Sequence, residues 1–99
     1  MTTKGDKVST MASTADDAYL DIKPSSGEEW SVHNICWGGA AELYFSDGTH
    51  NILVGSSESA GGRLGQYLNC TNTYYYRLRN VNGDTQYLGY DGVVTKIAT

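Results

Sequence analysis

Two histidines and two cysteines are the residues of this chain best suited to metal binding or nucleophilic chemistry. His33, His50, Cys36 and Cys70 are the only residues of these two types among the 99. A metal site requires further ligands at short spacing, and the sequence contains neither a C-x-x-C nor an H-x-x-x-H pattern. We therefore predict no metal ion and no cofactor, and we interpret His33 as a strand residue with a local hydrogen bond.

Catalysis by serine or by paired carboxylates has equally little support. No G-x-S-x-G pattern marks a nucleophile. The adjacent acids Glu28 and Glu29, or Asp16 and Asp17, could form a carboxylate pair. Neighbouring residues of a strand point to opposite faces, so such a pair cannot converge on one substrate bond. We predict that the chain is not an enzyme.

The aromatic residues carry more information. Eight tyrosines and two tryptophans accompany a single phenylalanine, which is more than the thin core of so short a chain can hold. Rings with a polar tip suit surfaces that are half dry and half wet. Three uses stay open: a sugar-stacking platform, a subunit interface, or a core role for Tyr74 and Tyr76 with the other rings on ordinary surface. The residues selected as the subunit interface or ligand platform are Trp37, Tyr44, Tyr75, Arg77 and Arg79.

Charge and hydropathy exclude two classes of partner. The net charge of −4 argues against nucleic-acid binding, which usually requires a basic face. No apolar run approaches the roughly 20 residues of a membrane-spanning helix.

No apolar signal segment follows Met1, so we expect Cys36 and Cys70 to be reduced. A disulfide between them would need adjacent strands.

The elements that would position these residues are strands. Apolar and polar residues alternate from Asp17 onward, and Pro24 ends the first strand. Asp47-Gly48 predicts a type I′ turn in a hairpin, Asn82-Gly83 predicts a second hairpin, and Asp91-Gly92 predicts a further turn. A long loop is expected over residues 55–63 and a strand over residues 64–70. About eight short strands with turns every 8–12 residues indicate an all-β sandwich or small barrel.

The first 16 residues differ from the rest of the chain. They are small and polar and lack strand alternation and helical periodicity. We predict an extended N-terminal arm over residues 1–16 and a β-sandwich domain over residues 17–99. The arm is either a frayed terminus or a segment that orders on a neighbouring subunit.

Three stretches resemble a known group of proteins. Residues 22–35 (IKPSSGEEWSVHNI), residues 42–49 (ELYFSDGT) and residues 76–94, which include GYDGVV, resemble small β-sandwich accessory virion proteins of tailed bacteriophages. These are capsid decoration (cement) proteins or head and tail fibre modules. The resemblance covers residues 18–97 approximately and omits the arm. It implies an antiparallel, jelly-roll-like β-sandwich, commonly a homotrimer.

The expected function follows from this resemblance. We expect a non-enzymatic capsid decoration protein that bridges and stabilises subunits of the major capsid protein. The residues of the arm expected to contact the capsid are Lys4, Lys7, Val8 and Met11. It would be made in the host cytoplasm and located in the virion, with no nucleic-acid or membrane partner. The alternative is a receptor- or glycan-binding module of a phage head or tail fibre.

Overall fold

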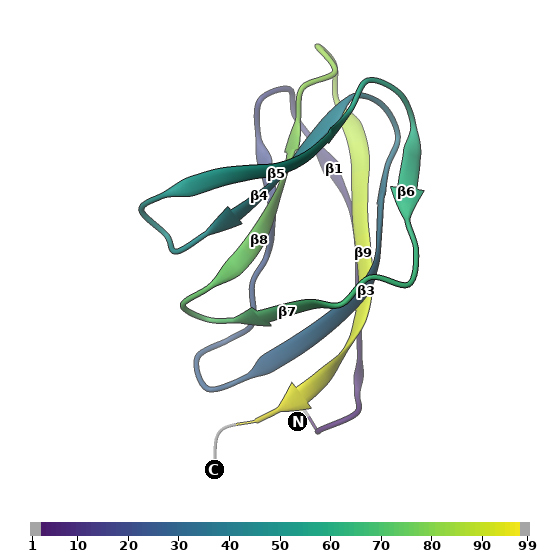
Figure 1. The fold of residues 1–99 in the computed structure, drawn as a ribbon. Coiled ribbons are helices and arrows are strands. Elements are labelled where there is room, and N and C mark those ends of the chain that lie inside the picture. Colours follow the sequence, from purple (N-terminus) through teal and green to yellow (C-terminus); the bar gives the residue numbers. More distant parts are fainter. Residues whose placement is uncertain (1–2, 98–99) are drawn as a thin grey trace.

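The computed structural model describes residues 3–97, which form nine strands and no helix (Figure 1). The strands are β1 (Lys7–Thr14), β2 (Tyr19–Ile22), β3 (Glu29–Trp37), β4 (Ala41–Ser46), β5 (Asn51–Ser57), β6 (Gly61–Arg63), β7 (Leu68–Thr71), β8 (Tyr75–Asn80) and β9 (Gln86–Lys96). The all-β class predicted from the alternation is therefore confirmed.

The strands form two antiparallel sheets that pack against each other. Sheet A has the order β1-β9-β3, and the other side of β3 pairs with β7 along residues 29–32 and with β6 along residues 35–37. Sheet B has the order β2-β8-β4-β5. The chain passes from one sheet to the other at almost every connection, so neighbours in the sequence often lie in opposite layers.

The pairing scheme is that of a rolled ribbon. The innermost hairpin pairs β4 with β5, and successive outer pairs join β3 with β7, β2 with β8, and β1 with β9. These pairs alternate between sheets B and A, which wraps the ribbon into a jelly roll. The prediction of an antiparallel, jelly-roll-like β-sandwich is confirmed.

The core lies between the two sheets and consists of branched aliphatic side chains. Its main members are each no more than 4% exposed and come from both layers: Ile22, Val32, Ile35, Leu43, Leu78 and Leu88. Burial of an aliphatic side chain contributes roughly 1.5–3 kcal/mol, so this layer is the principal source of stability. Trp30, Trp37 and Tyr90 pack at its margin and are only partly buried.

The hairpin around Asp47 is confirmed, but the type I′ turn is wrong. Four residues, 47–50, connect β4 to β5, and only Gly48 has a positive φ, of 93°. The Asp47 carboxylate accepts hydrogen bonds from the backbone N–H groups of Thr49 and His50, at 2.9 and 2.6 Å. The aspartate side chain organises a longer loop than its dipeptide predicts.

Two other turn predictions are wrong because the pairing is long-range. Asn82-Gly83 does not close a hairpin, since β8 lies in sheet B and β9 lies in sheet A. Asp91-Gly92 lies inside β9, where the pairing register with β3 shifts at His33. Gly92 is needed there because a Cβ atom would collide with the backbone of Ser31 and Val32.

The N-terminal segment is also different from the expectation. Residues 1–2 lie outside the described residues, but Lys7–Thr14 form β1, an edge strand of sheet A paired with β9 along its whole length. The extended arm predicted for residues 1–16 is therefore wrong for this stretch, which belongs to the sandwich. Its inward side chains, such as Thr10, Ala12 and Thr14, are too small or polar to produce an apolar alternation.

The segment 55–70 is less regular than predicted. The expected loop over residues 55–63 contains the end of β5 and all of β6, and the strand expected over residues 64–70 is reduced to β7. Glycines at 61 and 62 permit this pairing, because Gly62 lies tightly against the backbone of β3.

Candidate binding surfaces

The outer face of sheet B gathers four of the five residues selected as an interface or ligand platform. Tyr75, Arg77 and Arg79 alternate along β8, and Tyr44 lies opposite Arg77 on β4. Side chains two residues apart in a strand share one face, so the alternation brings them together. We call this surface, with Tyr19 and Asp21 of the neighbouring strand β2, the arginine face.

Arg77 is fixed by an aromatic ring and a carboxylate. Its guanidinium carbon lies 3.9 Å from the ring centroid of Tyr19, and its Nε donates a hydrogen bond of 2.6 Å to Asp21 Oδ1. The Tyr19 ring meets the Tyr44 ring edge to face, with 6.0 Å between centroids. Cation–π and charge-assisted contacts together hold the guanidinium in place.

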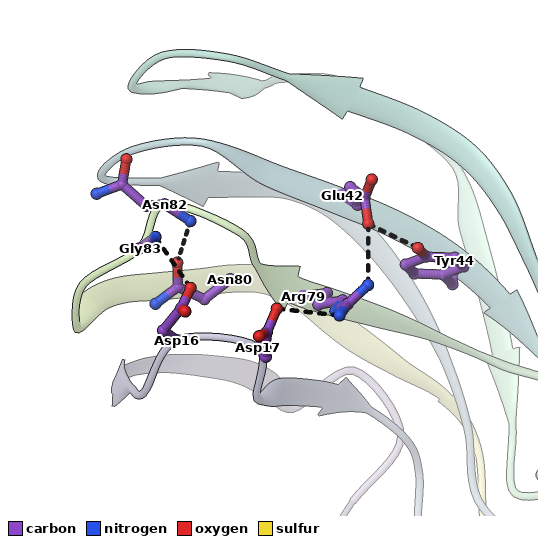
Figure 2. A network of polar contacts seen from close by, with 8 residues as sticks. All are labelled: Asp16, Asp17, Glu42, Tyr44, Arg79, Asn80, Asn82 and Gly83. Carbon is purple, nitrogen blue, oxygen red and sulfur yellow. Dashed lines mark hydrogen bonds and ion pairs between the residues drawn. The ribbon is translucent and has the colours of Figure 1, made fainter.

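Arg79 joins three elements (Figure 2). Its guanidinium donates to Asp17 Oδ1 at 3.0 Å and forms an ion pair with Glu42 Oε1 at 3.5 Å. The hydroxyl of Tyr44 donates to the same Glu42 oxygen at 2.6 Å, and this hydrogen bond raises the pKa of Tyr44, with burial adding to the effect. The charges of the arginine face are thus mutually neutralised, which suits a contact surface better than a reaction centre.

Two of the selected aromatic residues are not available on the arginine face. Tyr75 is only 6% exposed, with the ammonium of Lys23 lying 4.8 Å from its ring centroid. Trp37 belongs to β3 in the other sheet, where its indole N–H donates to the carbonyl of Ser59 at 2.9 Å. The structure instead adds Tyr19 and Asp21, whose positions depend on the pairing of β2 with β8.

A second candidate surface is a groove on the outer face of sheet A, with a volume of about 440 Å³. Met11 of β1 and Cys36 of β3 line the groove, and both lie opposite Gly89 of β9, which carries no side chain. Met11 is 71% exposed and Leu64 is 79% exposed beside it. We call this surface the Gly89 groove, and its rim is the more apolar of the two surfaces.

A polar cluster lies at one end of the Gly89 groove. Asp91 accepts hydrogen bonds from Ser9 Oγ at 2.5 Å and from Asn34 Nδ2 at 3.3 Å, and Lys7 Nζ lies 3.4 Å from the carboxylate. The hydrogen bond from Ser9 is the main reason that the pKa of Asp91 lies below its ordinary value, with Asn34 and Lys7 adding to it. The groove therefore combines an apolar rim with a fixed charge.

The four residues expected to contact a capsid separate into two groups. Lys7 and Met11 line the Gly89 groove. Val8 points inward from β1 and is half-buried, and Lys4 is exposed in the turn that precedes the strand. The sequence did not indicate Leu64 or Gly89 as neighbours of Met11. Gly89 comes close through the pairing of β1 with β9, and Leu64 follows β6, which reaches this face through the pairing of β9 with β3 and of β3 with β6.

The histidines and cysteines have local roles. His33 Nε2 lies 3.0 Å from Ser31 Oγ, and His50 Nδ1 lies 3.1 Å from the Asp47 carboxylate. The carboxyl pKa of Asp47 lies far below its usual range, mainly because the carboxylate accepts a hydrogen bond from the His50 backbone N–H. Both cysteines are free: Cys36 is exposed, whereas burial raises the pKa of Cys70 to about 12. Within residues 3–97, no group of three His, Cys, Asp or Glu residues is placed to hold a metal ion.

Two comparisons bear on identity. No model of a protein family matches the chain, and no curated protein is significantly similar to it. No helix long and apolar enough to cross a membrane occurs in the part of the chain that the structure describes. The function of this chain must therefore be inferred from its surfaces.

Proposed function

We propose that this chain is a non-enzymatic virion structural protein of the decoration (cement) type, which binds and bridges subunits of a major capsid protein. The observation that carries the proposal is the set of large apolar side chains left exposed on the outer side of sheet A. Met11, Leu64 and Tyr87 are 71%, 79% and 61% exposed. Met11 and Leu64 line the Gly89 groove, and exposed apolar side chains around a groove are typical of protein–protein contact sites.

Two further features support the proposal. The jelly roll is an architecture used by viral capsid proteins as well as by lectins, and three stretches of the sequence resemble accessory virion proteins of tailed phages. Because a fold alone does not establish a function, the surfaces carry more weight than the architecture.

A homotrimer is the proposed assembly, and the arginine face is its proposed subunit contact. Arg77 and Arg79 are held by Tyr19, Asp21 and Glu42, so little side-chain entropy remains to be lost when the face is covered. Tyrosine and arginine are enriched among the residues that dominate interface energies.

The second candidate is a glycan-binding module of a head or tail fibre. It is favoured by Tyr67, which is 81% exposed and whose ring meets His33 edge to face at 5.7 Å. An exposed ring held by a neighbour can stack on a sugar. Saturable sugar binding on a glycan array, abolished in Tyr67→Ala, would favour this candidate.

Co-sedimentation with capsids tests the first proposal. Purified chain should pellet with capsids that lack it, and the double variant Met11→Asp/Leu64→Asp should bind at least tenfold more weakly. Thr73→Asp, an exposed turn residue before β8, is the matched control and should bind as the wild type does. Equal binding by all three chains would show that the Gly89 groove is not the capsid contact, and binding by none of them would contradict the proposed function.

A further inference from the structure

We infer that the free edge of β5 is a docking site for an extended, acidic segment of another polypeptide, which would join sheet B as an additional strand. This inference does not depend on the proposed function, because it uses a different surface. It is supported by the exposed strand edge, by the apolar groove beneath it, and by one arginine without a carboxylate partner.

The edge of β5 lacks most of the usual protection, because the strand is neither short nor charged and contains no proline, and its one protective feature is the bulge at Val54. Strand β5 pairs only with β4, and its residues Ile52, Leu53 and Val54 are 62%, 51% and 48% exposed. No residue of Asn51–Ser57 is charged. Natural edge strands are normally shortened, charged or interrupted by proline, because unpaired N–H and C=O groups attract another strand.

The other sheet edges of the described residues are protected in these ways. Strand β2 has four residues and is followed closely by Pro24, and β6 and β7 have three and four residues. Strand β1 is long but carries Lys7 and many small polar side chains. The β4–β5 hairpin also projects from the body of the sandwich (Figure 1), which leaves its outer edge accessible.

An apolar groove lies between the sheets beneath this edge. It has a volume of about 380 Å³, and its apolar lining includes Phe45, Ile52, Val54 and Tyr76. In strand addition, backbone hydrogen bonds provide affinity and pockets for alternate side chains provide specificity. A strand added to β5 would direct every second side chain toward this groove. Because the lining is mostly apolar, these side chains should be apolar.

Arg63 supplies the charge preference. It extends from β6 toward β5, and its guanidinium occupies the space where Gly55 has no side chain, so a Cβ atom there would collide with it. The irregularity at Val54, where Leu43 pairs with Gly55 but Tyr44 pairs with Leu53, allows this approach.

Arg63 forms no ion pair or side-chain hydrogen bond with any described residue, whereas Arg77 and Arg79 are both paired with carboxylates. A guanidinium at the head of an apolar groove binds a carboxylate by charge-assisted hydrogen bonds. A second copy of β5 contains no acid to supply it. Charge complementarity therefore favours an acidic segment of a different protein.

Selection from a displayed library of random eight-residue peptides tests the inference. The wild-type chain should enrich peptides that alternate apolar residues and contain Asp or Glu. Arg63→Glu should reverse the preference to Lys or Arg, and Arg63→Gln should lose it. Lys4→Glu makes the same charge change on an exposed residue in the turn before β1, and it should select the same peptides as the wild type.

Backbone methylation tests the strand pairing separately. The best selected peptide is synthesised with N-methyl groups on alternate residues, in the two possible phases. One phase blocks the edge that faces β5 and should weaken binding at least tenfold, while the other should bind within about twofold of the parent peptide. Equal binding by both forms would show that no strand is added.

Three further results would overturn the inference. The first is failure of the correctly folded wild type to enrich any peptide, and the second is selection of the same peptides by Arg63→Glu. The third is sedimentation of the wild type as a dimer that Leu53→Lys returns to a monomer, which would assign the edge to a second copy. Loss of capsid binding by the Met11/Leu64 variant leaves peptide selection unchanged, so failures of the two proposals are distinguishable.

Discussion

Asn80 and Gln86 form a buried hydrogen bond that ties the two sheets together. Gln86 Nε2 donates to Asn80 Oδ1 at 2.8 Å, with the two residues 7% and 0% exposed. Asn80 ends β8 in sheet B and Gln86 begins β9 in sheet A. The Asn80 amide also donates to the carbonyls of Thr14 and Asp84, at 2.8 and 2.7 Å. One side chain thus fixes the point where the chain crosses between layers.

Replacement of Asn80 should be among the most damaging polar substitutions. Asn80→Ala removes the hydrogen bonds to the Thr14 carbonyl and from the Gln86 amide, which keeps only its bond to the Ala40 carbonyl. Because the site is buried, we expect a loss of about 2 to 4 kcal/mol in the free energy of unfolding. Urea denaturation measures the loss. The control, Asn51→Ala at the exposed start of β5, should change stability by no more than about 0.5 kcal/mol. A similarly small change in Asn80→Ala would contradict the bridging role.

Gly92 should not tolerate a side chain. The Cβ atom of Gly92→Ala would collide with the Ser31 carbonyl oxygen and would lie 2.7 Å from Val32 Cα, both of which are backbone atoms. We expect destabilisation of about 2 to 3 kcal/mol from this overpacking. In Gly61→Ala the nearest atom is 3.5 Å away, so that control should be neutral or slightly stabilising. Equal thermal midpoints for the two variants would refute the assigned pairing of β3 with β9.

The two cysteines should differ sharply in reactivity. At pH 8, Cys36 is exposed and should react rapidly with a chromogenic disulfide reagent. Cys70 is 1% exposed, and burial raises its pKa to about 12, so the reactive thiolate is scarce. One thiol per chain should titrate under native conditions and two in denaturant, and Cys36→Ser should abolish the native reaction. Rapid reaction of both thiols in the folded chain would show that β7 is not packed as described.

Acid should weaken the fold partly through Asp91. In the folded chain, hydrogen bonds from Ser9 and Asn34 lower the pKa of Asp91 below the ordinary value of 3.8. The Asp91 carboxylate therefore binds a proton less tightly in the folded chain than in the unfolded chain. The stability contributed by ionised Asp91 is fully present above the pKa that this carboxyl has in the unfolded chain. It is lost as the pH falls through the lower pKa that the carboxyl has in the folded chain.

Unfolding free energies at pH 6 and at about pH 2.5 test this linkage. The difference between the two pH values should be smaller in Asp91→Asn than in the wild type. The control is Asp84→Asn, whose carboxylate makes no hydrogen bond with a described residue, and it should preserve the wild-type difference. An unchanged difference in Asp91→Asn would show that the Ser9 contact does not favour the ionised form.

The sequence predicted those features that are encoded by local alternation. Tyr75, Arg77 and Arg79 alternate on β8, and the hairpin around Asp47 is closed by nearby residues, so both were recognisable. Asp91-Gly92 has the composition of a turn but lies inside β9. A dipeptide cannot indicate whether the strands on either side of it pair with each other or with distant partners.

The remaining features depend on long-range pairing. Strand β1 was missed because Thr10 and Ala12 face inward from an edge and provide little apolar contrast. Likewise, Met11 and Cys36 line the Gly89 groove together only because β1 and β3 pair with opposite sides of β9. Neither arrangement leaves a pattern in the sequence near the residues concerned.

Quantitative mass spectrometry of purified virions tests the proposed function most directly. Peptides of this chain should be present in intact particles at a fixed ratio to the major capsid protein, and the ratio should persist through gradient purification. Peptides found in the lysate of infected cells but absent from the purified particles would contradict the proposed function.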